Sequence, residues 1–199
     1  MIELLNTYIF LVPFCIALVF LGFAVVLEVK SRTLLRRHAP RLFLYATGLI
    51  LMYLIYIGYL QFLAFYEGGL VTPILGTGKG LLWFLSYIQL HFWNDYLVSL
   101  PAGILVALIG YYFNKKYAER FFEPEELYLA ALGILLVGYP GFLFYLPLVL
   151  ILSVAGSLLF VRRGERLPLY HFWIPTALVV LLVIQFWARN EEWWTSFRF

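Results

Sequence analysis

The segment that decides the fold of this chain runs from Phe121 to Gly141 and reads FFEPEELYLAALGILLVGYPG. Three carboxylates, Glu123, Glu125 and Glu126, surround its first proline, and a long apolar run with small residues follows them. This pattern predicts a closely packed membrane helix, and the Tyr-Pro-Gly sequence at its end predicts a turn. Acidic residues at the start of a membrane helix are costly, so they need a structural or a functional explanation.

The composition of the whole chain points to a membrane protein. Of its 199 residues, 64% are hydrophobic and 13% are charged, and the mean hydropathy is +0.91. Soluble domains are about half apolar and about a quarter charged, so this chain is predicted to be an all-α polytopic protein of the lipid bilayer. Its basic residues form short clusters, which argues against a nucleic-acid partner. The single cysteine, Cys15, excludes an internal disulfide and a cysteine-rich zinc module, and we expect no metal and no cofactor.

Six apolar runs are candidates for transmembrane helices. They cover residues 7–27, 42–66, 97–113, 125–138, 142–161 and 167–188. A helix needs about 20 apolar residues to cross a bilayer, and a seventh run, residues 81–93, is too short to do so comfortably. The third run carries Gly103, Ala107 and Gly110 at spacings of four and three, which favours close packing against another helix.

Clusters of lysine and arginine set the expected orientation. They lie in residues 30–41, 115–120 and 162–166, and such clusters remain on the cytoplasmic side. All three share that side only if an even number of crossings separates each pair, so we expect residues 81–93 to form a short interfacial or re-entrant helix. The prediction is a single integral membrane domain over residues 1–199, with six transmembrane helices, cytoplasmic basic loops and both termini outside.

This orientation brings two acidic residues to one depth in the membrane. Glu28 ends the first run and Glu125 begins the fourth, so both are expected at the cytoplasmic face. In aspartic proteolysis one carboxylate takes a proton from the attacking water, while the other donates a proton to the scissile carbonyl. Glu28 and Glu125 are therefore candidates for a catalytic pair. His171, at the start of the last run, is expected on the same side.

The sequence around both acids resembles that of type IV prepilin and preflagellin peptidases. In that family the first helix ends in an aspartate that precedes a basic stretch, and here the letters EVKSRTLLR, starting at Glu28, occupy this frame. The fourth helix of the family opens with Gly-x-Gly-Asp and continues into Leu-Ala-Ala-Leu-Gly. Residues 122–125 occupy the first motif, and residues 129–133 reproduce the second. Residues 167–170 are similar to the opening of the last family helix.

The resemblance implies an aspartic-type hydrolase (an endopeptidase) of the inner (plasma) membrane of a prokaryotic cell. Its substrates would be type IV pilus subunits, with short basic leader peptides ahead of an apolar helix, and it would need no metal. By the same comparison Glu28 and Glu125 would be catalytic. Glu126 and His171 are our candidates for substrate binding, and His171, on the same side as the acids, could also tune their protonation.

The chain also departs from the family pattern. Glutamates stand where the family has aspartates, Phe122 and Pro124 replace the two motif glycines, and Leu35 replaces a proline. Phenylalanine and proline cannot copy the backbone geometry that glycine allows. Two other functions therefore stay open. One is an inactive relative that serves as a membrane assembly or binding partner. The other is a small transporter, although few ionisable residues fall in the middle of the predicted spans.

Each candidate residue has a structural interpretation as well. Glu123, Glu125 and Glu126 suit the first turn of a helix, where carboxylates complement the helix dipole and Pro124 is well tolerated. Glu28 can extend to the membrane interface and pair with a neighbouring basic residue.

The histidines have similar alternatives. His171 can be an interfacial residue with a purely structural role. His91 and Asp95 lie four residues apart and favour a surface pair on one helix face. Two residues are too few for a protein metal site.

Overall fold

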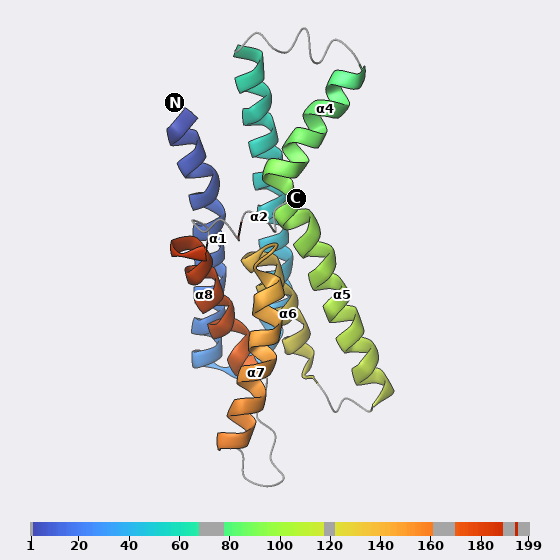
Figure 1. Cartoon of the computed structure of the whole chain (residues 1–199). Helices are drawn as coiled ribbons and strands as arrows, with labels where there is room; N and C mark the ends of the chain where they lie inside the picture. The colour runs from blue at the N-terminus through green and yellow to red at the C-terminus, as the bar shows by residue number, and fades with distance from the viewer. Residues whose placement is uncertain (1, 68–77, 118–121, 161–169, 189–193, 195–199) are drawn as a thin grey trace.

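The computed structural model describes residues 2–67, 78–117, 122–160, 170–188 and Trp194, and the secondary structure of this part of the chain is helical. The helices are α1 (Ile2–Lys30), α2 (Arg32–Glu67), α4 (Gly78–Ile88), the π-helical turn η1 (Gln89–Trp93), α5 (Asn94–Lys116), α6 (Pro124–Val137), α7 (Phe142–Phe160) and α8 (Tyr170–Phe186). They form an elongated bundle (Figure 1). The all-α prediction is confirmed for the described residues.

Within the described residues, four helical segments are long and apolar enough to cross a membrane. These segments are Leu11–Lys30, Arg32–Glu67, Lys79–Lys116 and Phe142–Leu159. Two helices in the predicted fourth and sixth positions are shorter, because α6 has 14 residues and α8 has 17. At about 1.5 Å per residue, α6 is about 21 Å long, against roughly 30 Å for the hydrocarbon core of a bilayer. The structure thus supports a helical membrane protein with four segments of spanning dimensions.

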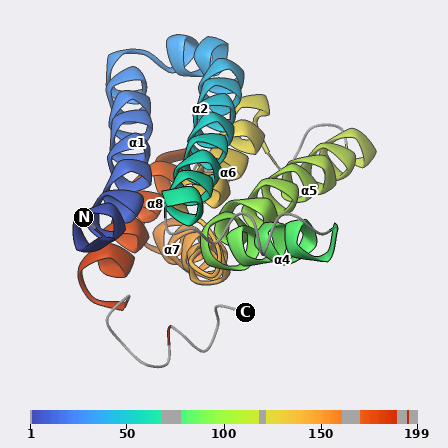
Figure 2. The ribbon, with the colours of Figure 1, turned by 90° about the horizontal axis from the view of Figure 1, so that it is seen from above.

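Helix α6 lies at the centre of the bundle (Figure 2). Each of its residues from Leu129 to Val137 is buried, and α1, α2, α5, α7 and α8 all contact it. A helix that is apolar around its whole circumference is stable where it is covered on every side. Protein helices provide that cover here, so the ends of α6 do not have to reach the lipid headgroups.

Small residues allow α5 to approach α6 closely. A Cβ added to Gly103 would lie 3.0 Å from the backbone oxygen and 3.3 Å from the Cα of Ala131. At Gly110 an added Cβ would overlap with the side chain of Leu127. Close approach of backbones increases the van der Waals contact that holds membrane helices together. The predicted small-residue face of α5 is therefore confirmed at both glycines.

The segment that was predicted to be a separate short helix belongs to a longer one. α4 continues through η1 into α5, and the combined segment crosses α2 near η1 (Figure 1). The predicted boundary at Trp93 is wrong, because the N–H of Asn94 still donates to the carbonyl of Gln89. Trp93 also fixes the crossing, since its indole Nε1 donates to the carbonyl of Leu54 at 3.0 Å. Gly58 of α2 leaves room for this indole ring, which would lie 3.2 Å from an added Cβ.

Aromatic side chains join α4 to the second half of α2. The ring of Phe65 lies edge-on to those of Trp83, Phe84 and Tyr87, with centroids 6.1, 5.4 and 5.7 Å away. Edge-to-face contacts at these distances are favourable beyond the area that they bury. These ring contacts join α4 to α2 beside the crossing.

A tight turn returns the chain from α6 to α7. Gly138 has a φ of 74°, a backbone conformation that glycine adopts without strain, and the Tyr139–Pro140 peptide bond is cis. The backbone N–H of Tyr139 donates to the carbonyl of Asp95 at 3.0 Å, which ties this turn to α5. Tyr145 then ties α7 to α8, because its hydroxyl donates to the carbonyl of Trp173 at 3.1 Å.

The contact between α6 and α7 generates a test of the buried position of α6. A Cβ on Gly133 would overlap with the hydroxyl group of Tyr145, whose side chain is fully buried. We expect Gly133→Ala to lower the free energy of unfolding by about 1–3 kcal/mol, the usual cost of overpacking a core. Thermal unfolding of the purified protein in detergent micelles measures this change.

Gly22→Ala is the matched control, because nothing lies within 4 Å of an added Cβ at that position in α1. Alanine in a helix interior is favoured over glycine by about 0.5–1 kcal/mol, so this variant is expected to be as stable as the parent or more so. Equal melting temperatures for Gly133→Ala and the parent would contradict the packing of α6 against α7.

Candidate functional site

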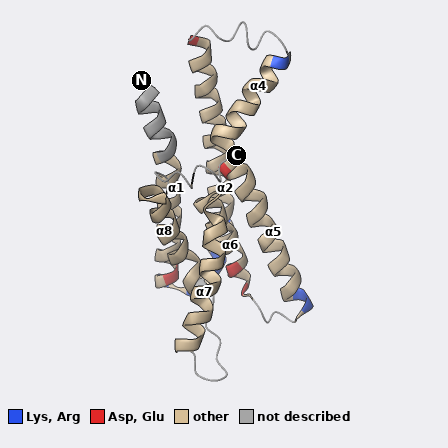
Figure 3. Ribbon diagram, viewed as in Figure 1, with Lys and Arg blue, Asp and Glu red and all other residues tan. Residues whose placement is uncertain are grey.

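Charged and polar side chains gather at the end of the bundle where α1 ends and α2, α6 and α8 begin. In Figure 3 the acidic residues at the end of α1 and the start of α6 lie at this end, as do the lysines at the end of α5. We call this group the carboxylate cluster. Its members are Glu28, Arg32, Arg36, Glu123, Glu125, Glu126 and His171.

Glu125 is the most deeply buried acid of the cluster, with 1% of its surface exposed. Two arginines from the first turns of α2 approach it. The Nε of Arg32 lies 3.4 Å from its Oε1, and the Nε of Arg36 lies 3.8 Å from its Oε2. Burying a carboxylate without partners is very costly, so these guanidinium groups offset part of the desolvation of Glu125. The side chains of both arginines are at least half exposed, which weakens the pairing.

Arg32 also contacts the carboxylate of Glu123, the N-cap residue of α6. One arginine of α2 thus joins two acids at the start of α6. The spacing of four residues between Arg32 and Arg36 puts both on one face of α2. This spacing of two arginines was visible in the sequence, but it did not by itself identify Glu125 as their partner.

Glu126 serves the local structure of α6. Its Oε2 accepts a hydrogen bond from the backbone N–H of Glu123 at 3.0 Å, as in the capping box found at helix N-termini. The side chain is 2% exposed. The structure therefore places Glu126, a predicted substrate-binding residue, against the backbone of its own helix. Pro124 occupies the first turn of the same helix, where its missing N–H is tolerated.

Glu28 pairs with His171 across the bundle. The His171 Nδ1 lies 2.7 Å from the Glu28 Oε1, and the contact joins the end of α1 to the start of α8. The Glu28 side chain is 16% exposed and that of His171 is 49% exposed, so water reaches this pair. A histidine at hydrogen-bond distance from a carboxylate can exchange a proton with it.

The two predicted catalytic acids thus lie at the same end of the bundle, as the sequence analysis expected. The structure gives them different partners, since Glu28 contacts His171 while Glu125 contacts Arg32 and Arg36. His171, the other predicted substrate-binding residue, contacts Glu28. Within the described residues, no group of three or more histidines, cysteines or acids has the arrangement of a metal site.

Asn114 holds the chain just before α6 in place. The backbone N–H of Phe122 donates to its Oδ1 at 2.8 Å, and its Nδ2 donates to the carbonyl of Phe122 at 2.5 Å. Asn114 is 7% exposed, so these bonds are shielded from water. They fix the backbone that leads into the buried Glu125. This role of Asn114 was not predicted from the sequence.

An apolar groove adjoins the carboxylate cluster. It has a volume of about 530 Å³ and lies between α5 and α6, with Phe43 of α2 also lining it. Pro124 and Leu127 line it on the side of α6, and Tyr111 and Lys115 line it on the side of α5. Pro124 is the residue before Glu125, so the groove extends to the start of α6, although Glu125 itself does not line it.

Comparisons with known proteins give no further guide to this site: no family model, curated protein or solved structure matches the chain.

The capping hydrogen bond of Glu126 can be tested by mutation, which distinguishes a role of its side-chain oxygen in capping from a role of its negative charge. We expect Glu126→Ala to lower the free energy of unfolding by about 1–3 kcal/mol, because it leaves the partly buried N–H of Glu123 without its acceptor. Glu126→Gln is the matched variant, since the side-chain oxygen of glutamine supports the same capping geometry and its cost is expected to be smaller. Chemical unfolding in detergent measures both changes. A glutamine variant as unstable as the alanine variant would contradict the capping role and point to the charge instead.

Proposed function

We propose that this chain is a prepilin-peptidase-like membrane protein that binds a short basic leader joined to an apolar helix and cleaves it with Glu28 and Glu125. The observation that carries the proposal is the buried carboxylate of Glu125 at the start of the enclosed helix α6, at the same end of the bundle as Glu28. A buried acid in a membrane protein is a candidate functional group.

The surroundings of Glu125 suit the chemistry of such a substrate. The carboxylate cluster offers the acids Glu28, Glu123 and Glu125, which attract basic side chains of a leader. The adjoining groove of about 530 Å³ is apolar and begins at Pro124. An apolar helix that follows a basic leader would enter this groove while its leader meets the acids.

The proposed reaction is hydrolysis of one peptide bond. One carboxylate accepts a proton from water as the water oxygen bonds to the peptide carbonyl carbon, and the other, protonated carboxyl donates its proton to the carbonyl oxygen. The carbon–nitrogen bond then breaks, and the departing amine takes up a proton. The Oε1 of Glu125 can bind water once the Arg32 side chain moves away from it. Arg32 can make this movement because its side chain is half exposed to solvent. His171 receives or returns the proton at Glu28.

The proposal includes the finer topology of six transmembrane helices in one domain, with the basic loops on the cytoplasmic side. In support of it, the first turns of α2, with Arg32 and Arg36, contact the start of α6, while Lys115 and Lys116 lie at the same end of the bundle. Loops on one side of a membrane share one end of a bundle, and short basic loops remain in the cytoplasm.

A second candidate function is an inactive relative that binds the same kind of segment without cleaving it. The contacts of Arg32 and Arg36 with Glu125 favour it, because an acid held by two guanidinium groups is a poor ligand for a catalytic water. The presence of Phe122 and Pro124 at the positions of the motif glycines also favours an inactive relative.

Cleavage of a precursor distinguishes the two functions. The substrate is a membrane-inserted peptide with a short basic leader ahead of an apolar helix, co-reconstituted with the protein in vesicles. We expect Glu28→Gln and Glu125→Gln each to reduce the cleavage rate by about 100-fold or more, the usual contribution of a general acid or base. Electrophoresis of the precursor and product measures the rate.

Glu67→Gln is the control, because it removes one negative charge at the exposed end of α2 and leaves the cluster intact. We expect it to cleave at the parental rate. Cleavage that persists unchanged in both cluster variants would sink the catalytic assignment. A parent protein that retains the precursor without cleaving it would instead support the inactive relative.

A further inference from the structure

The apolar groove between α5 and α6 ends at a basic residue that the proposed cleavage does not use. On the side of α5 its wall includes Ile104, Leu108, Tyr111 and Lys115. These residues recur at spacings of four, three and four, so they lie on one face of the helix. The groove thus runs along α5 from aliphatic side chains to a tyrosine and then to a lysine in the last turn.

The groove opens sideways, toward the surface that the bundle presents to its surroundings. Leu108 and Tyr111 are 59% and 61% exposed, and Ile104 is 43% exposed. All three belong to Lys79–Lys116, a segment with the length and hydropathy of a membrane span. Contiguous apolar surface of this kind marks a site of contact with lipid or with another protein. A lipid chain can therefore enter the groove from the side.

The length of the groove matches one leaflet of a bilayer. At about 1.5 Å per residue, α5 rises about 17 Å from Ile104 to Lys115. Half of a hydrocarbon core of roughly 30 Å is about 15 Å. With Lys115 at the level of the headgroups, Ile104 lies near the middle of the bilayer. The acyl chain of a lipid covers this distance, whereas a membrane-spanning helix of a partner protein extends about twice as far.

Lys115 determines the charge at the end of the groove. Its side chain is exposed, and no carboxylate of the described residues lies within ion-pair distance of it. The neighbouring Lys116 instead lies over the ring of Tyr117, 5.4 Å from its centroid. Basic pockets between membrane helices bind the anionic headgroups of phospholipids. The wall of the groove therefore provides an apolar surface for a chain and a cation for a headgroup.

The acids of the carboxylate cluster lie outside this groove. Glu123 and Glu125 flank Pro124, which lines the groove, but neither acid lines it. Each of them contacts an arginine of α2, which offsets its negative charge. Lys115 is thus the one charged residue among the described residues that line the groove, and its charge attracts a phosphate group.

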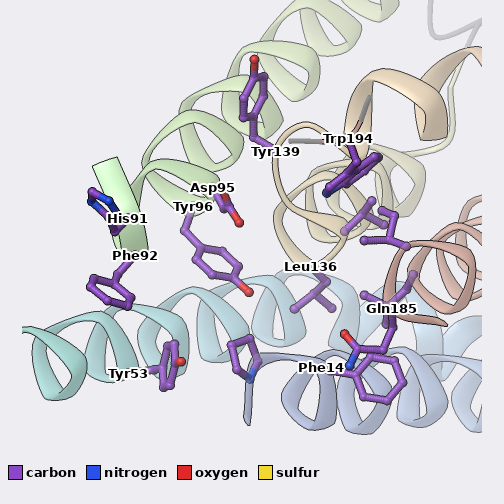
Figure 4. Close-up of a pocket in the computed structure, with 14 residues that line it drawn as sticks. Phe14, Tyr53, His91, Phe92, Asp95, Tyr96, Leu136, Tyr139, Gln185 and Trp194 are labelled. Atoms are coloured by element: carbon purple, nitrogen blue, oxygen red, sulfur yellow. The ribbon is translucent and has the colours of Figure 1, made fainter. Parts of the chain in front are cut away.

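The pocket at the other end of α6 differs in charge (Figure 4). Asp95 lines it from α5, and aromatic side chains, among them those of Phe92 and Trp194, form much of its wall. The described residues that line this pocket include no lysine and no arginine. An anionic headgroup is therefore favoured at the groove, at the end of α5 that carries Lys115, and not at this pocket.

We propose that the groove holds one acyl chain of an anionic phospholipid, with the phosphate of the headgroup bound to Lys115. Tyr111 of α5 and Tyr128 of α6 line the groove near this end, and tyrosines are common at the level where lipid headgroups meet the hydrocarbon. A substrate helix that enters the same groove must displace this chain. The lipid site depends on the groove and on Lys115 rather than on the catalytic acids, so the lipid test and the cleavage test can fail independently.

Retention of lipid by the full-length protein tests the proposal. The protein is reconstituted in nanodiscs of equal parts phosphatidylglycerol and phosphatidylcholine, extracted into detergent and analysed by native mass spectrometry. We expect phosphatidylglycerol to be retained about fivefold more than phosphatidylcholine, the usual effect of one lysine at a membrane surface. Lys115→Gln is expected to abolish this preference. Lys116→Gln is the matched control, because it removes the same charge one residue away from the groove, and it is expected to keep the preference.

Photolabelling locates the retained chain. Phosphatidylglycerol with a photoreactive group at the end of one acyl chain is expected to label the protein near Ile104, at the apolar end of the groove. Ala107→Phe places a ring in the groove and is expected to reduce this labelling at least about tenfold, because the chain loses its buried contacts. Leu105→Phe is the control. Leu105 is 57% exposed on α5 and does not line the groove, so labelling near Ile104 is expected to persist.

Several outcomes would overturn the proposal. Equal loss of the preference in Lys115→Gln and Lys116→Gln would show a general attraction to the charged end of α5. Labelling near Ile104 at the parental level in Ala107→Phe would place the chain outside the groove. A polypeptide retained in place of lipid would show a protein partner instead. If Ala107→Phe does not fold, as judged by its melting temperature in detergent, the two lysine variants and the position of the label decide the question.

Discussion

The enclosure of α6 constrains the rest of the structure. Each residue from Leu129 to Val137 is buried, yet the helix begins with two acids that are almost fully buried as well. Apolar surface is stabilised by the cover of other helices, while buried carboxylates and free backbone N–H groups need polar partners. Arg32 and Arg36 must therefore reach Glu125 from α2, and Glu126 must turn back onto the helix end. The contacts of Arg32 and Arg36 with Glu125 therefore fix the position of the start of α2 relative to the start of α6.

The sequence was sufficient for the features that depend on local composition. Apolar runs predicted the helices, and the small residues of α5 predicted its close contact with α6, which Gly103 and Gly110 make. It was also sufficient to bring Glu28 and Glu125 to one end of the bundle. The partners of these acids were harder to predict from the sequence. Arg32 and Glu125 are 93 positions apart, and their contact depends on how whole helices pack against one another. Glu28 and His171 are 143 positions apart, and the same argument applies.

Helix boundaries were less predictable where the backbone departs from the regular α-helix. Residues 81–93 look like a short helix because polar residues, Asn94 and Asp95, follow them. A π-helical turn carries the chain through these residues without a break, and such turns have no strong local signature. The tertiary contact of Trp93 with the carbonyl of Leu54 holds this turn against α2. The feature is thus a product of packing, and no local sequence pattern specifies it.

The unequal lengths of the helices have a consequence for the surrounding lipid. At about 1.5 Å per residue, α7 and α8 are about 28 and 26 Å long, whereas α2 is about 54 Å long. A hydrocarbon core of roughly 30 Å is close to the described lengths of the first two helices and far too thin for the third. An α2 that crosses such a bilayer must tilt or emerge from it. The thickness of the surrounding bilayer would therefore set how far α2 tilts or protrudes, and with it the orientation of the helices packed against α2.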